Sequence, residues 1–466
     1  MKNTSSRKHS IGARSFLTAI AVIFVLMVAT YVLTLVLPGG EYARVTDETG
    51  NTVIDTAGGF TQTEGGIPFW KWALSPFLVL GASGSGALIA VIAFLLVIGG
   101  IFEALEKSGL ITYMLGRLTQ RFGRTRYRLL AVITFFFMAL GAAIGSFEEC
   151  VPLVPLSVAL SVSLGWDAMT GIGMSLLATG CGFASGVCNP FTVGVAQELA
   201  GLPMFSGFWL RLLAFVLIYI LLFTFLFLHA RKIARPIEGA QTEVMPYDAR
   251  MHRGLLAFAI ILGLGILIVL SSGFIPALQS LTMIIVAVMF LVAGITATLL
   301  CGMRAPMLGS RFCHGLVAIL PAVIMILMAA SIKYTLEEAS VMDTILHGAV
   351  RQAEYLPSWS VILFIYLIVL VMNFFIPSGS AKAFMLIPLI VPLAQLFGLS
   401  TQLCIVAFAF GDGFSNVFYP TNPALLISLG LAETSYGKWF KFSWRFQALN
   451  LLLTSGILLL GLAVGY

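Results

Sequence analysis

The sequence predicts an all-α integral membrane protein, built as an inverted repeat with two re-entrant hairpins, two broken helices and about nine transmembrane spans. Hydrophobic residues make up 59% of the 466 residues and charged residues only 10%, whereas soluble domains are about 25% charged. Apolar runs of roughly 20 residues, long enough to cross the hydrocarbon core, recur along the whole chain. The second half also repeats a pattern of the first.

Basic residues set the predicted orientation. The apolar run 16–37 is expected to be a retained first span, because it is too long for a signal peptide and lacks a small-residue cleavage site. Four basic residues precede it: Lys2, Arg7, Lys8 and Arg14. The positive-inside rule therefore predicts a cytoplasmic N-terminus. The acidic, Gly-rich segment 38–83 is expected to be an external loop, after which the run 84–101 returns inward.

Two adjacent glutamates lie in the apolar stretch AAIGSFEECVPLVP at 142–155, where a carboxylate costs at least ~2.5 kcal/mol. A full span over 129–143 would leave later basic loops outside. We therefore predict a re-entrant hairpin at about 129–164 that enters from the cytoplasm and turns back at GSFEE, covered by protein or a water-filled cavity. The charged, amphipathic segment before it is expected to form an interfacial helix or a plain cytoplasmic loop.

The second half matches the first at an offset of 233 residues. Four pairs carry the match: Pro155 with Pro388, Gly165 with Gly398, Gly180 with Gly413, and Asn189-Pro190 with Asn422-Pro423. The match predicts a second hairpin at about 359–397, with its tip at PSGSAK. Flanking charges are reversed, so one hairpin is expected to open to each side of the membrane, as in secondary transporters.

The predicted boundaries divide the chain into two repeats. The expected spans are 16–37, 84–101, 169–199, 207–229, 254–272, 279–301, 313–332, 402–432 and 446–464. The first repeat covers 1–229. A cytoplasmic linker with an unpaired connecting span, 230–278, inverts the second repeat, 279–466.

The helices that follow the hairpins, 169–199 and 402–432, contain helix-breaking residues. The first contains ATGCGFASGVCNPF from residue 178, and the second contains FGDGFSNVFYPTNP from residue 410. Proline removes a backbone donor and glycine permits unusual backbone conformations, so we expect breaks at mid-membrane. Broken ends expose amides and carbonyls that bind an anionic group and a cation side by side. The alternative for a single break is a packing kink.

The glutamate pair at the first tip, Glu148 and Glu149, suits a proton, Na⁺ or a substrate ammonium, because two close carboxylates repel each other. The alternative is a structural pair that caps the hairpin turn. By the offset, Glu149 corresponds to Lys382, so one tip is acidic and the other basic, which fits a zwitterion. Alternatively, Lys382 pairs with Glu148, Glu149 or Asp412 and touches no solute.

These arguments select two sets of site residues. The candidate substrate-binding residues are Ser146, Glu148, Glu149, Asn189, Ser378, Ser380, Lys382 and Asn422. The candidate coupling-ion residues are Glu148, Glu149, Asp412, Asn416 and Thr421. The serine hydroxyls serve either a solute carboxylate or backbone groups freed by the turn. The expected coupling ion is H⁺ or Na⁺, with no cofactor, no catalytic residue and no other metal.

Four motifs resemble the YfcC-type transporters of the C4-dicarboxylate anaerobic carrier (DcuC-like) family, within the ion transporter superfamily. They are the EE at 148–149, GFASGVCNPFTVGVAQELAGLPMFSGFWLR from residue 182, PSGSAKA from 377, and FGDGFSNVFYPTNPALL from 410. The resemblance covers nearly the whole chain. It implies a homodimer in the bacterial inner membrane, in which a domain holding the hairpins and broken helices moves like an elevator.

These features predict a secondary active transporter, working by ion-coupled symport or exchange, for a small carboxylate-bearing solute. The acidic tip favours an amino acid, especially a basic one; the alternative is a C4-dicarboxylate or a short-chain carboxylate. An intramembrane enzyme is the alternative from a different class, since a glutamate pair can perform acid–base chemistry, but no nucleophile motif accompanies it. The sequence has no phosphate-binding glycine motif, and its basic residues lie between apolar runs, so no nucleic-acid partner is expected.

Overall fold

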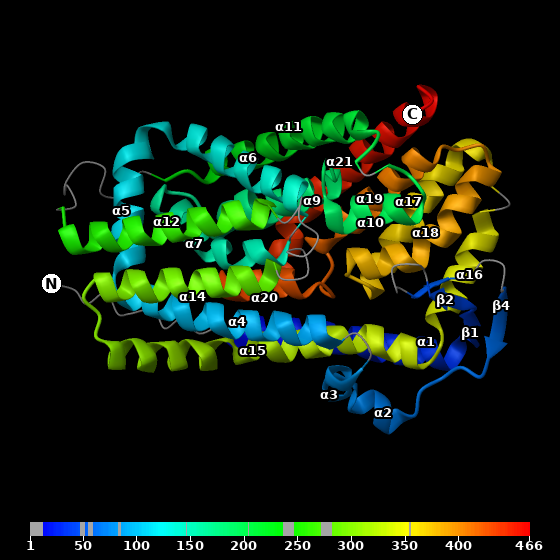
Figure 1. Ribbon diagram of the computed structural model, residues 1–466, viewed down its shortest axis with the longest axis horizontal. Coiled ribbons are helices and arrows are strands. Elements are labelled where there is room, and N and C mark those ends of the chain that lie inside the picture. The colour runs from blue at the N-terminus through cyan, green and yellow to red at the C-terminus, as the bar shows by residue number, and fades with distance from the viewer. Residues whose placement is uncertain are drawn as a thin grey trace.

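The computed structural model describes residues 13–46, 52–54, 59–82, 85–145, 147–203, 205–235, 247–271, 282–353 and 356–466. Within these ranges the chain is mostly helical, and its longest helices run along the longest axis of the molecule (Figure 1). Six cysteines lie in these ranges and all are free thiols.

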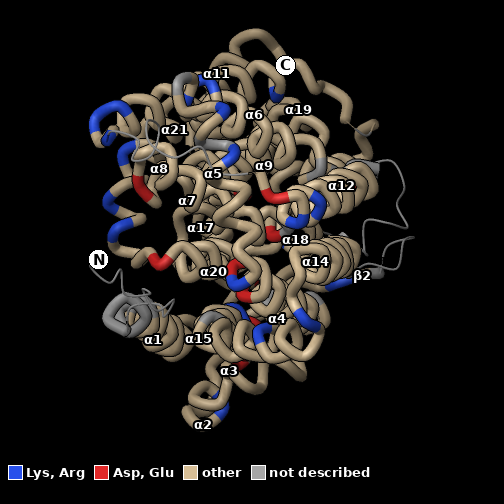
Figure 2. The backbone as a smooth tube through the Cα atoms, turned by 90° about the vertical axis from the view of Figure 1, so that its left-hand side faces the viewer, with Lys and Arg blue, Asp and Glu red and all other residues tan. Residues whose placement is uncertain are grey.

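One bundle of helices lies on one side of the molecule (Figure 2). It contains α1 (Ala13–Val36), α4 (Ser85–Lys107), α14 (Thr282–Leu300) and α15 (Ala305–Glu338), and α12 (Ala249–Ser271) packs against α14. Glycines bring α4 and α15 together, since a Cβ added at Gly315 would lie 2.7 Å from the Gly100 Cα. Larger side chains there would separate the two backbones.

The acidic segment after α1 holds short strands and helices as well as loops. The elements are β1 (Gly39–Tyr42), β2 (Arg44–Thr46), β3 (Thr52–Ile54), β4 (Phe60–Thr63), α2 (Phe69–Ala73), α3 (Ser75–Leu78) and η1 (Val79–Gly81). Strand β1 pairs antiparallel with β4, with Gly39 opposite Thr63, and β2 pairs antiparallel with β3. An ion pair of 2.7 Å between Arg44 and Asp343 ties this segment to α16 (Met342–Ala353).

Two pairs of helices occupy the predicted hairpin segments. The first pair is α6 (Arg126–Ile144) and α7 (Val154–Ser163), joined by the short helix η3 (Glu148–Leu153). The second pair is α17 (Ser358–Phe375) and α18 (Gly379–Leu396). The amphipathic segment before the first pair is the helix α5 (Leu110–Phe122), joined to α6 through η2 (Gly123–Thr125), so the loop alternative is wrong. Helices α5 and α16 lie at opposite ends of the long axis (Figure 1).

Both predicted breaks are present. The first broken helix consists of α8 (Ala168–Ile172), the π-helical η4 (Gly173–Leu177), α9 (Ala178–Ser185), η5 (Pro190–Gly194) and α10 (Val195–Leu199). The second consists of α19 (Thr401–Asn416) and α20 (Pro423–Leu431). We call the interruption at 186–189 break 1 and that at 417–422 break 2. Helices α11 (Phe208–Ile233) and α21 (Tyr436–Ala463) follow them.

A second bundle contains the two hairpin segments, the two broken helices, α11 and α21, and its two halves touch where α9 packs against α19. A Cβ added at Gly413 would fall on the backbone of Ala184, with the Ala184 nitrogen only 2.6 Å away. Gly413 is one of the glycines that the sequence repeat singled out. Its missing side chain allows the two broken helices to lie against each other.

In the part of the chain that the structure describes, seven helices are long and apolar enough to cross a membrane, and four shorter apolar helices accompany them. These helices indicate a multi-pass membrane protein. The count of nine spans and the inverted relation of the halves stay predictions.

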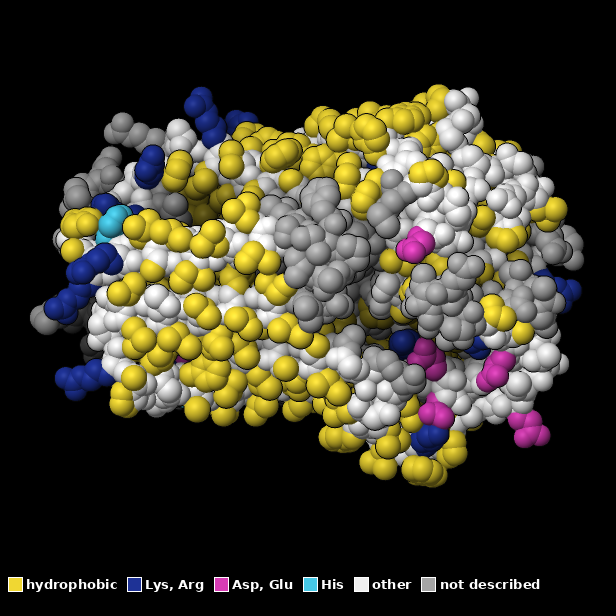
Figure 3. Space-filling view, viewed as in Figure 1, with side chains coloured by type: hydrophobic (Ala, Val, Ile, Leu, Met, Phe, Trp, Pro, Cys, Tyr) yellow, Lys and Arg dark blue, Asp and Glu magenta, His cyan; other side chains and the backbone are white. Residues whose placement is uncertain are grey.

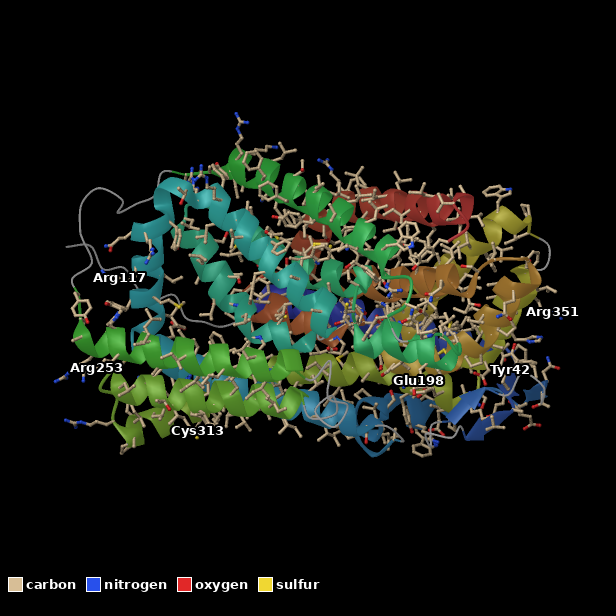
Figure 4. All side chains as sticks on the ribbon, turned by 45° about the horizontal axis from the view of Figure 1, so that its top comes forward. Tyr42, Arg117, Glu198, Arg253, Cys313 and Arg351 are labelled. Atoms are coloured by element: carbon tan, nitrogen blue, oxygen red, sulfur yellow. The ribbon has the colours of Figure 1, made fainter. Side chains whose placement is uncertain are left out.

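Charged side chains lie mainly at the two ends of the long axis. In the face that Figure 3 shows, one end carries mostly Lys and Arg, the other carries Asp and Glu together with further Lys and Arg, and hydrophobic side chains lie between the ends. Arg117 and Arg253 lie at the first end, and Tyr42 and Arg351 at the second (Figure 4). The orientation that the positive-inside rule predicts for the basic segments stays a prediction.

Candidate functional site

Lys382 lies at the centre of a buried polar cluster. It follows Ser378, whose side chain caps the start of α18, and its own side chain is 0% exposed. Its ammonium Nζ donates to the Asp412 Oδ1 at 2.6 Å, to the Ile376 carbonyl at 3.0 Å and to the Asn373 Oδ1. Of the two roles considered for Lys382, the structure shows the ion pair with Asp412.

A chain of amides extends this cluster to break 2. The Asn373 Nδ2 donates to the Ser415 Oγ at 2.6 Å and to the Asn416 Oδ1 at 2.9 Å. The Asn422 Nδ2 donates to the same Asn416 oxygen at 3.0 Å. The structure thus brings together four of the predicted residues: Lys382, Asp412, Asn416 and Asn422.

Asn373 and Ser415 belong to this network, although sequence reasoning missed both. A signal for Asn373 was present, because it is the only amide in the apolar run SWSVILFIYLIVLVMNFF. Polar residues inside the membrane are expensive and mark functional positions. Ser415 carried a weaker signal, since serine often bonds its own helix, and its hydroxyl does donate to the Gly411 carbonyl at 2.9 Å.

Asn189 and Asn422 both cap the helical segment that follows their break. The Asn189 Oδ1 accepts from the Thr192 backbone N–H at 3.2 Å, and the Asn422 Oδ1 accepts from the Leu425 N–H at 3.3 Å. Each side chain thus caps the helical segment that begins after its break. Asn189 also touches the first hairpin tip, because Gly145 has φ +70° and a Cβ there would overlap the Asn189 side chain. These oxygens are therefore occupied by the protein's own backbone.

Three buried oxygens near the breaks have no hydrogen-bond partner among the described residues. They are the Asp412 Oδ2, the Thr192 Oγ1 and the Thr421 Oγ1. Gly379 links two of these residues, since a Cβ at Gly379 would lie 2.6 Å from the Asp412 Oδ2 and 2.5 Å from the Thr192 Cγ2. The second hairpin tip, the segment η5 that follows break 1 and the Asp412 carboxylate therefore meet. A cation or an N–H group of a solute would satisfy such oxygens.

Glu148 begins η3 at the first tip and is half-buried. Its carboxylate accepts hydrogen bonds from the backbone of Phe147 and Glu148, and it interacts electrostatically with Asp412. Helix η3 begins without a side-chain cap, so whether the glutamate pair binds a cation or holds the turn stays a prediction. The Glu149 backbone lies in η3, but its side chain, like the whole of Ser146, lies outside the described residues.

The serines at the second tip are more open than the rest of the cluster. Ser378 is exposed and Ser380 is half-buried. The Ser378 Oγ accepts from the Ala381 N–H at 3.5 Å, which is the backbone use that the sequence allowed. Among the described residues, no group of three or more His, Cys, Asp or Glu side chains could hold a metal ion.

Around Asp412, and leaving aside Arg211 beside break 1, the described charges leave a negative balance. Glu148 and Asp412 are two carboxylates, and Lys382 is a single ammonium that already pairs with Asp412. A solute with an extra positive charge would offset this balance, whereas a second anion would increase it.

Comparisons with known proteins agree with these features. The family model "C4-dicarboxylate anaerobic carrier" (DcuC) matches residues 16–463. The Escherichia coli protein named "Putative basic amino acid antiporter YfcC" is 29% identical over 408 residues, which cover 82% of this chain and 80% of that protein. A Haemophilus influenzae uncharacterized protein is 23% identical over 378 residues, 77% of this chain and 72% of its own.

Two solved transporter structures are more distant. The YdaH transporter of Alcanivorax borkumensis is 19% identical with a TM-score of 0.44, over 97% of this chain and 99% of that chain. MtrF of Neisseria gonorrhoeae is 14% identical with a TM-score of 0.46, over 95% of this chain and 94% of that chain.

Proposed function

The chain belongs to the C4-dicarboxylate anaerobic carrier (DcuC) family, and from this premise we propose that it is a secondary active transporter of a basic amino acid. The observation that carries the proposal is the negative balance of Glu148, Lys382 and Asp412 at the tips and breaks. A basic amino acid has two ammonium-type groups and one carboxylate, so its net positive charge complements this balance. The name of the Escherichia coli relative agrees with this substrate class.

A C4-dicarboxylate is the second candidate, and the family's name favours it. It would bring two negative charges to a site whose buried lysine already pairs with a carboxylate. Uncompensated charge in a region of low dielectric is costly. The described geometry therefore supports this candidate less than a basic amino acid.

The coupling ion is proposed to be H⁺ or Na⁺, held near the unpartnered oxygens of Asp412, Thr192 and Thr421. For the topology, we further propose nine spans, an inverted repeat and a cytoplasmic N-terminus. We also propose that the protein is a homodimer in the bacterial inner membrane and that its second bundle makes an elevator-type movement. The arrangement of the helices in two bundles supports the elevator-type movement. Both symport and exchange are compatible with these proposals.

The first test is the thermal stability of the purified protein with arginine, ornithine, a neutral amino acid, succinate or acetate, each with and without Na⁺. A ligand at about 100 times its Kd stabilises the protein by roughly 2.7 kcal/mol. We expect arginine or ornithine to stabilise the wild type and to lose this effect in Glu148→Gln. Glu198→Gln is the matched control, because Glu198 is exposed on α10.

Succinate stabilisation without any arginine effect would replace the proposal with the dicarboxylate reading. Counterflow in proteoliposomes then tests transport itself. Saturable exchange of labelled arginine, recovered chemically unchanged, is expected of a carrier, whereas conversion of the solute would favour the intramembrane enzyme.

A further inference from the structure

Arg211 is a fully buried cation on α11. It is 0% exposed, and its Nη2 donates to the Phe205 carbonyl at 3.2 Å and to the Val187 carbonyl at 3.5 Å. Its Nε and Nη1 have no hydrogen-bond partner within the described ranges. The titratable side chains that interact with it are the Tyr466 hydroxyl, which also hydrogen-bonds to it, and the Cys188 thiol, not carboxylates. Since a guanidinium keeps its charge in proteins, this arginine has no counter-ion among the described side chains.

A buried charge of this kind is expensive unless it is paired. Two N–H-bearing nitrogens without acceptors add the cost of unmade hydrogen bonds. An anion would satisfy both requirements, and a carboxylate suits the planar guanidinium best among the groups of an amino acid. The need for an anion therefore follows from the surroundings of Arg211 within the described structure.

The second half shows that a break does not need an arginine to bind its free carbonyl. There the buried Trp439 donates its indole Nε1 to the Val417 carbonyl at 2.8 Å. In the matching motifs, SGFWLR and YGKWFK, Trp439 corresponds to Trp209 and Lys441 to Arg211. Trp209 is 49% exposed and Lys441 is exposed. The first motif therefore bonds its break through the arginine, and the second bonds its break through the tryptophan. A neutral donor is sufficient for the carbonyl, which leaves the charge of Arg211 unexplained by capping.

The position of Arg211 adjoins the proposed site. Its partner Val187 lies in break 1, two residues before Asn189, which touches the first hairpin tip. On the other side, a Cβ at Gly186 would lie 3.5 Å from the Cβ of Ala409, one turn of α19 before Asp412. Break 1 thus lies between the guanidinium of Arg211 and the helix that carries the Asp412 carboxylate.

We propose that Arg211 binds the carboxylate of the transported amino acid, while the acidic groups at Glu148 and Asp412 bind its cationic end. This inference rests on the proposed function and adds an anion subsite to it. A single site with a cation at one side and carboxylates at the other recognises both ends of the solute. The site would then bind amino acids more tightly than simple amines, because only amino acids carry a carboxylate for Arg211.

The test compares arginine with agmatine, which is arginine without its carboxylate. We expect the wild type to bind arginine roughly 10- to 150-fold more tightly than agmatine, the range for a hydrogen bond to a charged group. Arg211→Gln should lower arginine affinity by this factor and leave agmatine affinity unchanged. Arg211→Lys should keep part of the preference, and Lys441→Gln, the exposed counterpart, should keep all of it.

Equal losses of arginine and agmatine affinity in Arg211→Gln would overturn the inference, because a structural role affects both ligands alike. If Arg211→Gln does not fold, the same ratio is measured in Arg211→Lys, and a ratio equal to that of the wild type overturns it. A chloride requirement shared by both ligands would assign the guanidinium to a free anion instead. A wild type that binds neither ligand would contradict the proposed function itself. The ratio of the two affinities in the variants tests only the role of Arg211.

Discussion

The two broken helices share their backbone caps but differ in the charges around them. Asn189 and Asn422 cap the segments after the two breaks in the same way. Asp167 caps the start of the first broken helix, whereas its match 233 residues later, Ser400, caps the second with a neutral hydroxyl. The first break has a buried arginine beside it, and the second has a buried lysine–aspartate pair.

This comparison separates two kinds of requirement. The free amides and carbonyls at a break need hydrogen-bond partners in both halves. Each kind of partner is a neutral side chain in at least one half: the asparagine caps in both halves, and Ser400 and Trp439 in the second half.

Buried charge does not recur at equivalent positions. The counterpart of the buried Arg211 is the exposed Lys441, and the counterpart of Asp412 is Thr179, so the backbone alone does not require buried charge. We therefore propose that the buried charges serve solute and ion binding, while the asparagines hold the breaks.

The largest expected effect tests the ion pair near break 2. Lys382→Met leaves the Asp412 carboxylate buried without its partner, and breaking such a pair costs about 3–5 kcal/mol. We expect a strongly lowered midpoint of thermal unfolding and loss of arginine binding. Adding Asp412→Leu to Lys382→Met should recover much of the stability, because neither charge then remains, but it should not recover binding. Lys441→Met, at an exposed position, serves as the control, and equal midpoints for both single variants would contradict the prediction.

A smaller effect tests how each half binds its free carbonyl. Trp439→Phe removes the indole donor of the Val417 carbonyl, and leaving a buried acceptor unsatisfied costs about 1–3 kcal/mol. Trp209→Phe is the matched control, because Trp209 is 49% exposed and water can reach its indole. Its effect on the free energy of unfolding should stay within about 0.5 kcal/mol. Similar losses for the two tryptophans would remove the asymmetry between the breaks.

The smallest effect concerns the charged cap of the first broken helix. Burial raises the pKa of the Asp167 carboxyl, but hydrogen bonds from His229 and Thr170 outweigh it and hold the pKa below its ordinary value. The stability that Asp167 contributes is therefore present above its unfolded-state pKa and is lost as pH falls through the lower pKa of the folded state. Because the Asp167 side chain is 40% exposed, solvent screening keeps this contribution below about 1 kcal/mol.

The check is the unfolding midpoint measured from about pH 7 down to about pH 3, across the usual range for an aspartate. Asp167→Asn keeps a capping side chain and should flatten the pH dependence in this range. Ser400→Ala removes the equivalent neutral cap and should lower the midpoint equally at all pH values. A pH profile of Asp167→Asn that matches the wild type would refute the assignment.

Much of the fold could be predicted because its signals are local. Glycine and proline mark the breaks and turns whatever surrounds them, and Gly165 and Gly398, matched in the repeat, both adopt positive φ. Apolar run lengths located the helices but not all of their ends, since α15 begins eight residues before the predicted 313–332 and α21 ten residues before the predicted 446–464. The amphipathic pattern located α5. These features depend on backbone chemistry and on the bilayer as solvent, which act on each segment separately.

The pairing of charges could not be predicted, because it depends on distances between segments remote in sequence. The sequence identified Lys382 and Asp412 as buried charges and left several partners open, and only the packing of α18 against α19 joins them. Arg211 had no distinguishing pattern, since its exposed counterpart Lys441 stands in nearly the same motif. Which face of a helix meets a break is decided by the rotation of that helix in the bundle. The sequence by itself thus determined where the chain bends and which charges are costly, while the tertiary structure decided which groups those charges meet.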